Sequence, residues 1–171
     1  MLNKTTITAI RTLVFVGLNP GAEPSSVRCI AERLGESPTY MAKVAGLLVK
    51  AGILQARRGV AGGIELNRPA EQINFLEIVE ACQGTILPDY CRDTRSLSDT
   101  CAFHAATAEL HQAITGVLSR WTLAQFVRCP VPSAGSVAMS ACILAPCLAS
   151  RKSNKHRPSS AHQGKKLRAG K

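Results

Sequence analysis

The side chains with the richest chemistry in this chain are its seven thiols, at Cys29, Cys82, Cys91, Cys101, Cys129, Cys142 and Cys147. The count is odd and the sequence contains no CxxC pair. The apolar N-terminal stretch is interrupted by Arg11 and lacks a small-residue cleavage site, so we expect no secretion signal and therefore no disulfide framework. Cys29 and Cys82 lie within helical patterns, where we expect small buried apolar side chains.

A second candidate chemistry is the binding of phosphate and base edges by exposed basic and hydroxyl side chains. Arg57 and Arg58 stand beside Gly59-Val60-Ala61-Gly62-Gly63, where three glycines permit a tight, exposed turn. With so little bulk around them, the guanidinium groups and the Gly59 backbone can approach a narrow minor groove. A plain tight turn is the alternative interpretation.

Outward positions of the preceding helical segment carry the matching polar groups. They are Thr39, Tyr40, Lys43 and Lys50, and Ser37 precedes them as the expected N-cap. Hydroxyls can reach phosphate or base edges, lysine supplies charge for phosphate, and a helix N-terminus favours an anion. A lysine on an exposed helix is also common as solvated surface, so the pattern must be judged with its neighbours.

Overall charge gives little help in that judgement. The formal net charge is +10, but residues 151–171 hold eight lysines and arginines and no acidic residue. Residues 1–150 hold thirteen basic and eleven acidic residues. The excess charge is therefore a property of the C-terminal tail, and such tails are often solvated arms. A nucleic-acid partner has to be argued from the order of the elements instead.

Hydrophobic periodicity and capping residues predict those elements. Helices are expected over residues 4–18, 25–35, 37–51 and 74–83, and short strands over 53–57 and 64–67. Three helices followed by a glycine-tipped hairpin is the order of a winged helix-turn-helix, with residues 35–38 as its turn. The predicted fold class is therefore mostly α with a small β-hairpin wing, and the third helix would enter the major groove of double-stranded DNA.

A long helix is predicted over residues 101–119, with a short helix from Trp121 to about Val127. Its apolar positions alternate in steps of three and four, at Phe103, Ala106, Leu110, Ala113 and Val117. That spacing is typical of a coiled-coil seam, and the alanines allow close helix approach. We expect a homodimer through this helix; one more core-facing helix is the alternative.

Three regions follow from these patterns. We expect a DNA-binding domain over residues 1–85, a sensor loop and dimerisation helix over 86–128, and a disordered basic tail over 129–171. No apolar run approaches the length of about 18 residues that a membrane span requires. We therefore expect a cytoplasmic protein with no membrane partner.

Residues 2–127 resemble the IscR/NsrR-type regulators of the Rrf2 family. The resemblance lies in residues 30–35, 37–41, 48–54, 58–64, 76–81 with Gly84, 101–104 and 121–123. It implies a homodimer that binds a pseudo-palindromic operator, usually as a repressor. It also implies that the third helix and the wing touch DNA and that the loop before the long helix senses a signal.

Cluster-binding members of that family use three cysteines in this loop, in some cases with a histidine or a carboxylate. Here Cys91 and Cys101 are separated by nine residues, His104 follows, and residues 92–100 contain no cysteine. Thiolates with an imidazole suit an iron–sulfur cluster if another residue completes the ligand set. Three interpretations stay open: a cluster, a thiol redox switch of Cys91 with Cys101, or an inert loop.

No catalytic constellation is present in the sequence, since no serine has a nucleophile-elbow context and no phosphate-binding loop or paired-carboxylate motif occurs. We therefore expect no enzyme. The alternative to a DNA-binding regulator is a winged-helix module for protein–protein contact, with a thiol or metal site and no specific DNA binding. The nearly balanced charge of residues 1–150 is what favours that alternative.

Overall fold

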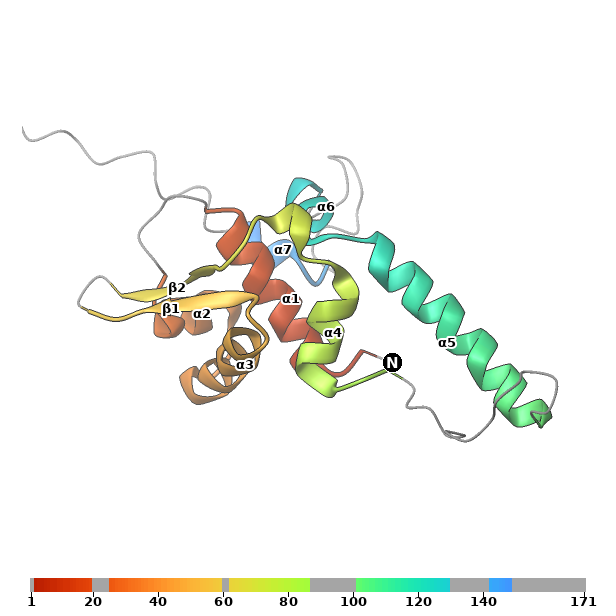
Figure 1. The fold of residues 1–171 in the computed structure, drawn as a ribbon. Helices are drawn as coiled ribbons and strands as arrows, with labels where there is room; N and C mark the ends of the chain where they lie inside the picture. Colours follow the sequence, from red (N-terminus) through yellow and green to blue (C-terminus); the bar gives the residue numbers. More distant parts are fainter. Residues whose placement is uncertain (1, 20–24, 60–61, 87–100, 130–141, 149–171) are drawn as a thin grey trace, which may run out of the picture.

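The computed structural model describes residues 2–19, 25–59, 62–86, 101–129 and 142–148. The elements in chain order are α1 (Lys4–Gly17), α2 (Val27–Leu34), α3 (Pro38–Lys50), β1 (Leu54–Arg57), β2 (Gly63–Leu66), a 3-10 turn η1 (Ala70–Gln72), α4 (Phe75–Gln83), α5 (Ala102–Arg120), α6 (Leu123–Arg128) and α7 (Ala145–Leu148). The structure is mostly helical, with β1 and β2 forming a hairpin (Figure 1). The predicted fold class is confirmed.

Short polar residues begin these helices as the sequence predicts. The side chains of Ser26, Ser37 and Asn74 each accept a backbone N–H from the first turn of α2, α3 and α4. Such caps satisfy amide groups that have no partner inside the helix. At the other end of α2, Gly35 adopts φ +70°, a left-handed conformation that favours glycine. The chain can therefore turn sharply from α2 into α3.

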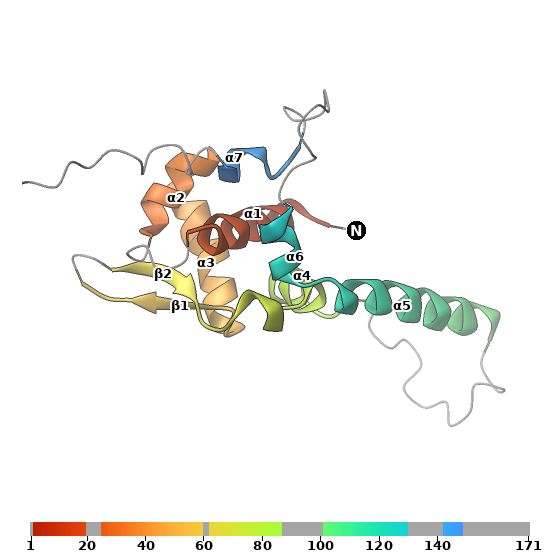
Figure 2. The ribbon, with the colours of Figure 1, turned by 90° about the horizontal axis from the view of Figure 1, so that it is seen from above.

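Helix α1 lies at the centre of the fold. It packs against α2, α3, α4, α6, α7 and β2 (Figures 1 and 2). Ala9, Leu13 and Val14 are fully buried, as is the hydroxyl-bearing Thr12. The Thr12 hydroxyl donates to the Thr8 carbonyl at 2.8 Å, so this buried polar group is satisfied. The main core therefore surrounds α1 on most of its circumference.

The wing is a two-stranded antiparallel hairpin in which Leu54 pairs with Leu66 and Arg57 with Gly63. Its tip depends on glycine. Gly59 has φ +115°, and the Gly62 amide donates to the Gly59 carbonyl at 2.9 Å. A Cβ on Gly62 would lie 2.4 Å from the Arg57 carbonyl oxygen, so a side chain cannot fit without moving the backbone. Residues 60–61 lie outside the described residues.

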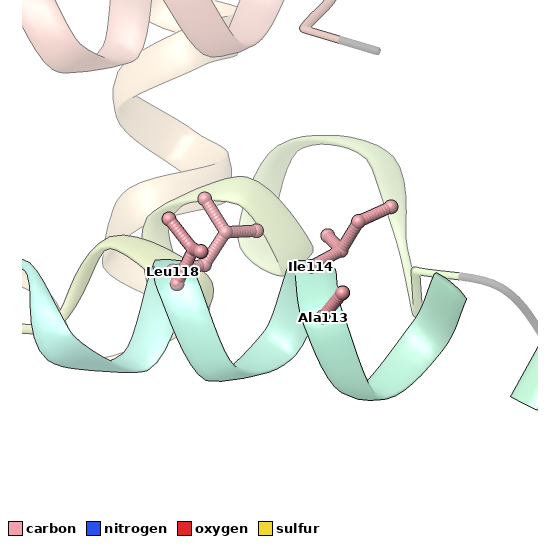
Figure 3. A pocket seen from close by; sticks show the side chains of 4 residues that line it. Ala113, Ile114 and Leu118 are labelled. Atoms are coloured by element: carbon pink, nitrogen blue, oxygen red, sulfur yellow. The ribbon is translucent and has the colours of Figure 1, made fainter. Parts of the chain in front are cut away.

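Helix α5 extends from the end of the molecule opposite the wing (Figures 1 and 2). Leu118 is buried with Val79 and Ile86, and Ile114 packs against this cluster beside α4 (Figure 3). The predicted seam lies elsewhere on the helix: the side chains of Phe103, Leu110 and Val117 are 66%, 50% and 45% exposed. Helix α5 thus has a core-facing side, which the seam prediction omitted, and an exposed apolar side.

Two expectations about buried cysteines are affected by the structure. Cys29 is exposed, because the buried side of α2 is formed by its neighbours Ile30, Ala31 and Leu34; the expectation of burial was wrong. Cys82 is half-buried, and burial raises the pKa of its thiol to about 11 although a hydrogen bond with Thr6 opposes the rise. Its thiol is therefore protonated at neutral pH.

The expected disordered tail also needs correction, because residues 142–148 are structured. They include α7, whose Cys147 is fully buried in the main core. The sequence pattern did not predict this helix, since a four-residue helix is too short to show a hydrophobic period. Within the described residues, no helix is both long and apolar enough to cross a membrane.

Candidate nucleic-acid interface and sensor residues

The exposed side of α3 carries most of the predicted groups. Thr39, Lys43 and Lys50 are exposed, spaced so that they follow one side of the helix. Ser37 is also exposed, and its hydroxyl oxygen accepts the Tyr40 amide at 3.2 Å as the N-cap. Helix α3 is therefore capped at its N-terminus by Ser37, and accessible polar side chains lie beside this cap.

Tyr40 departs from the prediction of an outward hydroxyl. Its side chain is half-buried and packs against the main core. Its hydroxyl donates to the Thr5 hydroxyl at 3.3 Å, and the Lys4 ammonium lies 5.0 Å from the centre of its ring. Tyr40 precedes the fully buried Met41 in the helix, so it lies at the edge of the core face. It links α3 to the start of α1 instead of pointing outward.

Small side chains, which sequence reasoning missed, lie beside the lysines on this face. Ala42 and Gly46 are exposed, and an added Cβ on Gly46 would have no heavy atom within 4 Å. Val49 is 37% exposed at the far end. The helical spacing of these positions from Thr39 could have identified them. The surface of α3 beside its charged groups therefore has little side-chain bulk, which allows the α3 backbone to approach a flat or grooved partner closely.

The wing arginines differ in their partners. The Arg57 Nε donates to Glu65 in a short charged hydrogen bond, and the Gln55 amide donates to the same carboxylate oxygen at 2.8 Å. Arg58 is exposed, and the structure gives its side chain no hydrogen bond or ion pair with any described residue. Arg57 is therefore neutralised within the hairpin, whereas the Arg58 guanidinium is available at its tip.

Two of the three predicted sensor residues, Cys101 and His104, lie at the N-terminal end of α5. Cys101 is the N-cap residue; its thiol is exposed and makes no capping hydrogen bond. The Nδ1 atom of His104 is buried without a hydrogen-bond partner among the described residues. Cys91 lies outside the described residues.

An accessible thiol and an unpartnered imidazole nitrogen, three residues apart, suit part of a soft ligand set. Within the ranges that the structure describes, however, no three His, Cys, Asp or Glu residues are grouped as a metal site. Cys101 and His104 alone therefore do not fit a complete cluster shell.

Comparison with known proteins gives the family. The Rrf2 family, described as an iron-dependent transcriptional regulator, matches residues 2–129. The chain is 33% identical over 118 residues to slr0846 of Synechocystis sp., named as an HTH-type transcriptional regulator; the match covers 68% of this chain and 80% of that protein. It is 28% identical over 131 residues to protein aau3 of Rhizobium meliloti, covering 74% of this chain and 84% of aau3.

Solved structures of this fold agree with the architecture. CymR, the global cysteine regulator of B. subtilis, superposes with a TM-score of 0.62 at 22% identity, covering 75% of this chain and 96% of CymR. IscR of T. potens superposes with a TM-score of 0.63 at 22% identity, covering 80% of this chain and 92% of IscR. At these identities the likeness establishes the fold alone.

The family match covers the whole span from α1 to α6. The family and its named relative are transcriptional regulators, so the expectation that the chain is not an enzyme is confirmed. The sequence resemblance is confirmed as well: this chain belongs to the Rrf2 family of transcriptional regulators.

Proposed function

We propose that the chain is a homodimeric repressor that binds a pseudo-palindromic operator in double-stranded DNA. Helix α3 lies in the major groove, and the wing reaches into the flanking minor groove. The observation that carries the proposal is Arg58 at a glycine tip, exposed and with no hydrogen bond or ion pair to any described residue. The wing packs through β1 against α3, which has Thr39, Lys43 and Lys50 exposed. This combination supplies phosphate contacts and a group for reading groove shape.

The local distribution of charge favours DNA over a protein partner, although basic and acidic residues nearly balance over residues 1–150. Helix α3 contains two lysines and no acidic residue. On α2, by contrast, Arg28 is paired with Glu32 at 3.2 Å, and on the wing Arg57 is paired with Glu65. Among the described residues, Lys43 and Lys50 on α3 and Arg58 at the wing tip have no acidic partner; Arg33 on α2 and Arg120 on α5 also have none. The cations of α3 and the wing tip therefore remain available to a polyanion.

Two features support homodimerisation through α5. The exposed apolar side of the helix, with Phe103, Leu110 and Val117, has no cover in the monomer, and burying it removes apolar area from water. An apolar depression beside it, lined by Ala113, Ile114, Val117 and Leu118, can receive a side chain from a second copy (Figure 3). Because the wing lies at the other end of the molecule, joining two copies at α5 leaves both wings free for two half-sites.

The signal response belongs, in this proposal, to Cys91, Cys101 and His104. The accessible Cys101 thiol supports it, as does the His104 Nδ1 atom, which has no hydrogen-bond partner among the described residues. Such groups serve either as part of an iron–sulfur ligand set or, for the two cysteines, as a thiol pair that closes to a disulfide on two-electron oxidation. Both forms require Cys91 and Cys101 together. The family resemblance implies that the DNA-bound protein represses transcription.

The wing contact is tested by Arg58→Ala and Lys50→Ala, measured on duplexes with A·T-rich and G·C-rich flanks. Loss of Arg58 should cost about 1–3 kcal/mol and reduce the preference for A·T-rich flanks, because a narrow minor groove attracts the guanidinium. Lys50→Ala should weaken both duplexes by the same factor, because a phosphate contact carries no base information. Unchanged affinity and flank preference in Arg58→Ala would show that the wing does not read DNA.

The dimer is tested by Leu110→Glu, with mass measured by light scattering. Two like charges in an apolar seam should leave the protein monomeric. The matched control is Ser119→Glu, an exposed position nine residues further on and on the opposite side of the helix, which should stay dimeric. A dimeric Leu110→Glu protein would contradict the assignment of the seam.

The sensor is tested by purifying the protein without oxygen, recording its absorption spectrum and iron content, and then oxidising it. Cys91→Ser and Cys101→Ser should each abolish the same response, whether it is a cluster spectrum or an oxidative disulfide. Cys29→Ser is the control, because Cys29 is also exposed but lies on α2. A cluster or disulfide that persists in Cys101→Ser would remove this part of the proposal.

A further inference from the structure

Arg11 connects the central helix to the turn of the helix-turn-helix. Its Nη2 atom donates to the Leu34 carbonyl at 2.8 Å, and its Nη1 atom lies 3.7 Å from a carboxylate oxygen of Glu36. Leu34 is the last residue of α2, where carbonyl groups lack partners inside the helix. The Arg11 guanidinium therefore caps α2 and also holds Glu36, two residues after the end of the helix.

Glu36 receives further support from α1. Its carboxylate lies 3.3 Å from the Lys4 ammonium and accepts the Thr8 hydroxyl at 3.4 Å. Its backbone amide donates to the Ala31 carbonyl at 2.9 Å. Ser37, the cap of α3, comes next in the chain. The contacts of Arg11 and Glu36 therefore set where the recognition helix begins.

The C-terminal segment, residues 142–148, contacts this same part of α1. Helix α7 packs on both α1 and α2 (Figure 2). Cys147 is fully buried there, and its Sγ atom donates to the Arg11 carbonyl oxygen at 3.3 Å. Leu144 packs against the same core. The family match ends at residue 129, so the contact is made by a part of the chain outside the family domain.

Arg11 is held on two sides: its side chain contacts Leu34 and Glu36, and its backbone carbonyl accepts from Cys147 of α7. Its side chain is 16% exposed, and its Nε atom is buried without a hydrogen-bond partner among the described residues. A buried cation of this kind is stable only while its remaining partners stay in place. Burial raises the pKa of the Cys147 thiol to about 11, with the nearby Arg11 charge opposing the rise. The thiol is therefore neutral at physiological pH and brings no second charge beside the guanidinium.

We propose that residues 142–148 form an intramolecular brace that positions the recognition helix for DNA through Arg11. With the segment packed on α1 and α2, Arg11 is fixed, the α2–α3 turn is fixed, and α3 enters the groove without first being ordered. When the segment dissociates from α1 and α2, the Arg11 side chain becomes hydrated and conformationally free. DNA binding must then order the α2–α3 turn, which lowers the affinity. Arg11 is a positioning residue in this scheme. The inference rests on the proposed DNA binding.

The test uses the full-length protein and the duplex that the wild type enriches from a random-sequence library. Cys147→Glu places a charge in the buried contact, and Ile143→Glu places the same charge on the same segment at a position that is 54% exposed. Affinity should fall by about three- to thirty-fold in Cys147→Glu, the range of a coupling contact, and stay at the wild-type value in Ile143→Glu. Because both variants keep the basic tail and carry one added acid, long-range charge effects cancel.

A double-mutant cycle identifies the route. Arg11→Met should weaken binding by a similar factor, and Arg11→Met with Cys147→Glu should be no weaker than Arg11→Met alone, because both act through one contact. Hydrogen exchange of the Glu36 amide should accelerate in both single variants but not in Ile143→Glu. A purely structural role would lower the melting temperature and leave affinity well below that temperature unchanged.

The outcomes separate the two proposals. If the wild type enriches no duplex, the proposed DNA binding fails. If it does and Cys147→Glu binds like Ile143→Glu, or the losses of Arg11→Met and Cys147→Glu simply add, the brace is overturned. Should Cys147→Glu fail to fold, Leu144→Glu carries the same comparison, since Leu144 is only half-buried.

Discussion

Burial of α1 is the constraint on which the other elements depend. Nine of its fourteen residues are buried, and three of these are threonines. A helix enclosed on most sides can accept polar residues only where each hydroxyl finds an acceptor, as Thr12 does on the Thr8 carbonyl. The other elements pack on most of its circumference: α2, α3, α4, α6, α7 and β2 all contact it.

This arrangement assigns the functional groups to surfaces that the core does not need. Helix α3 uses Met41, Val44 and Leu48 against α1 and its neighbours, which leaves its other side free for Thr39 and the lysines. Helix α5 likewise uses Leu118 against α4 and leaves Leu110 exposed. A buried central helix thus carries a proposed DNA-binding surface at one end of the molecule and a proposed dimer surface at the other (Figure 1).

Much of the fold was predictable because the residues that begin and end its helices act through local contacts. Ser37 followed by Pro38, Asn74 before α4 and Gly35 after α2 each act within one helical turn, so a sequence pattern is enough to find them. The hairpin tip was predictable for the same reason, since its glycines are required by backbone geometry.

What could not be predicted depends on contacts between distant segments. Tyr40 reads as an outward residue until α1 supplies Thr5 as its partner. The pairing of Arg57 with Glu65 requires the strand register, and the packing of Cys147 on Arg11 joins residues 136 positions apart in the chain. Neither helical periodicity nor composition contains that information. The sequence therefore identified two candidate arginines on the wing, but not that Arg57 pairs with Glu65.

Recognition of a specific duplex is central to the proposed function. It is tested most directly by selecting sequences from a random duplex library with the full-length wild-type protein at physiological salt. We expect one enriched motif with two half-sites related by two-fold symmetry, their centres about 10 base pairs or a multiple of that apart, bordered by A·T-rich steps where the wings lie. A pool that still matches the starting library after repeated rounds, or that binds only in low salt without sequence preference, would contradict it.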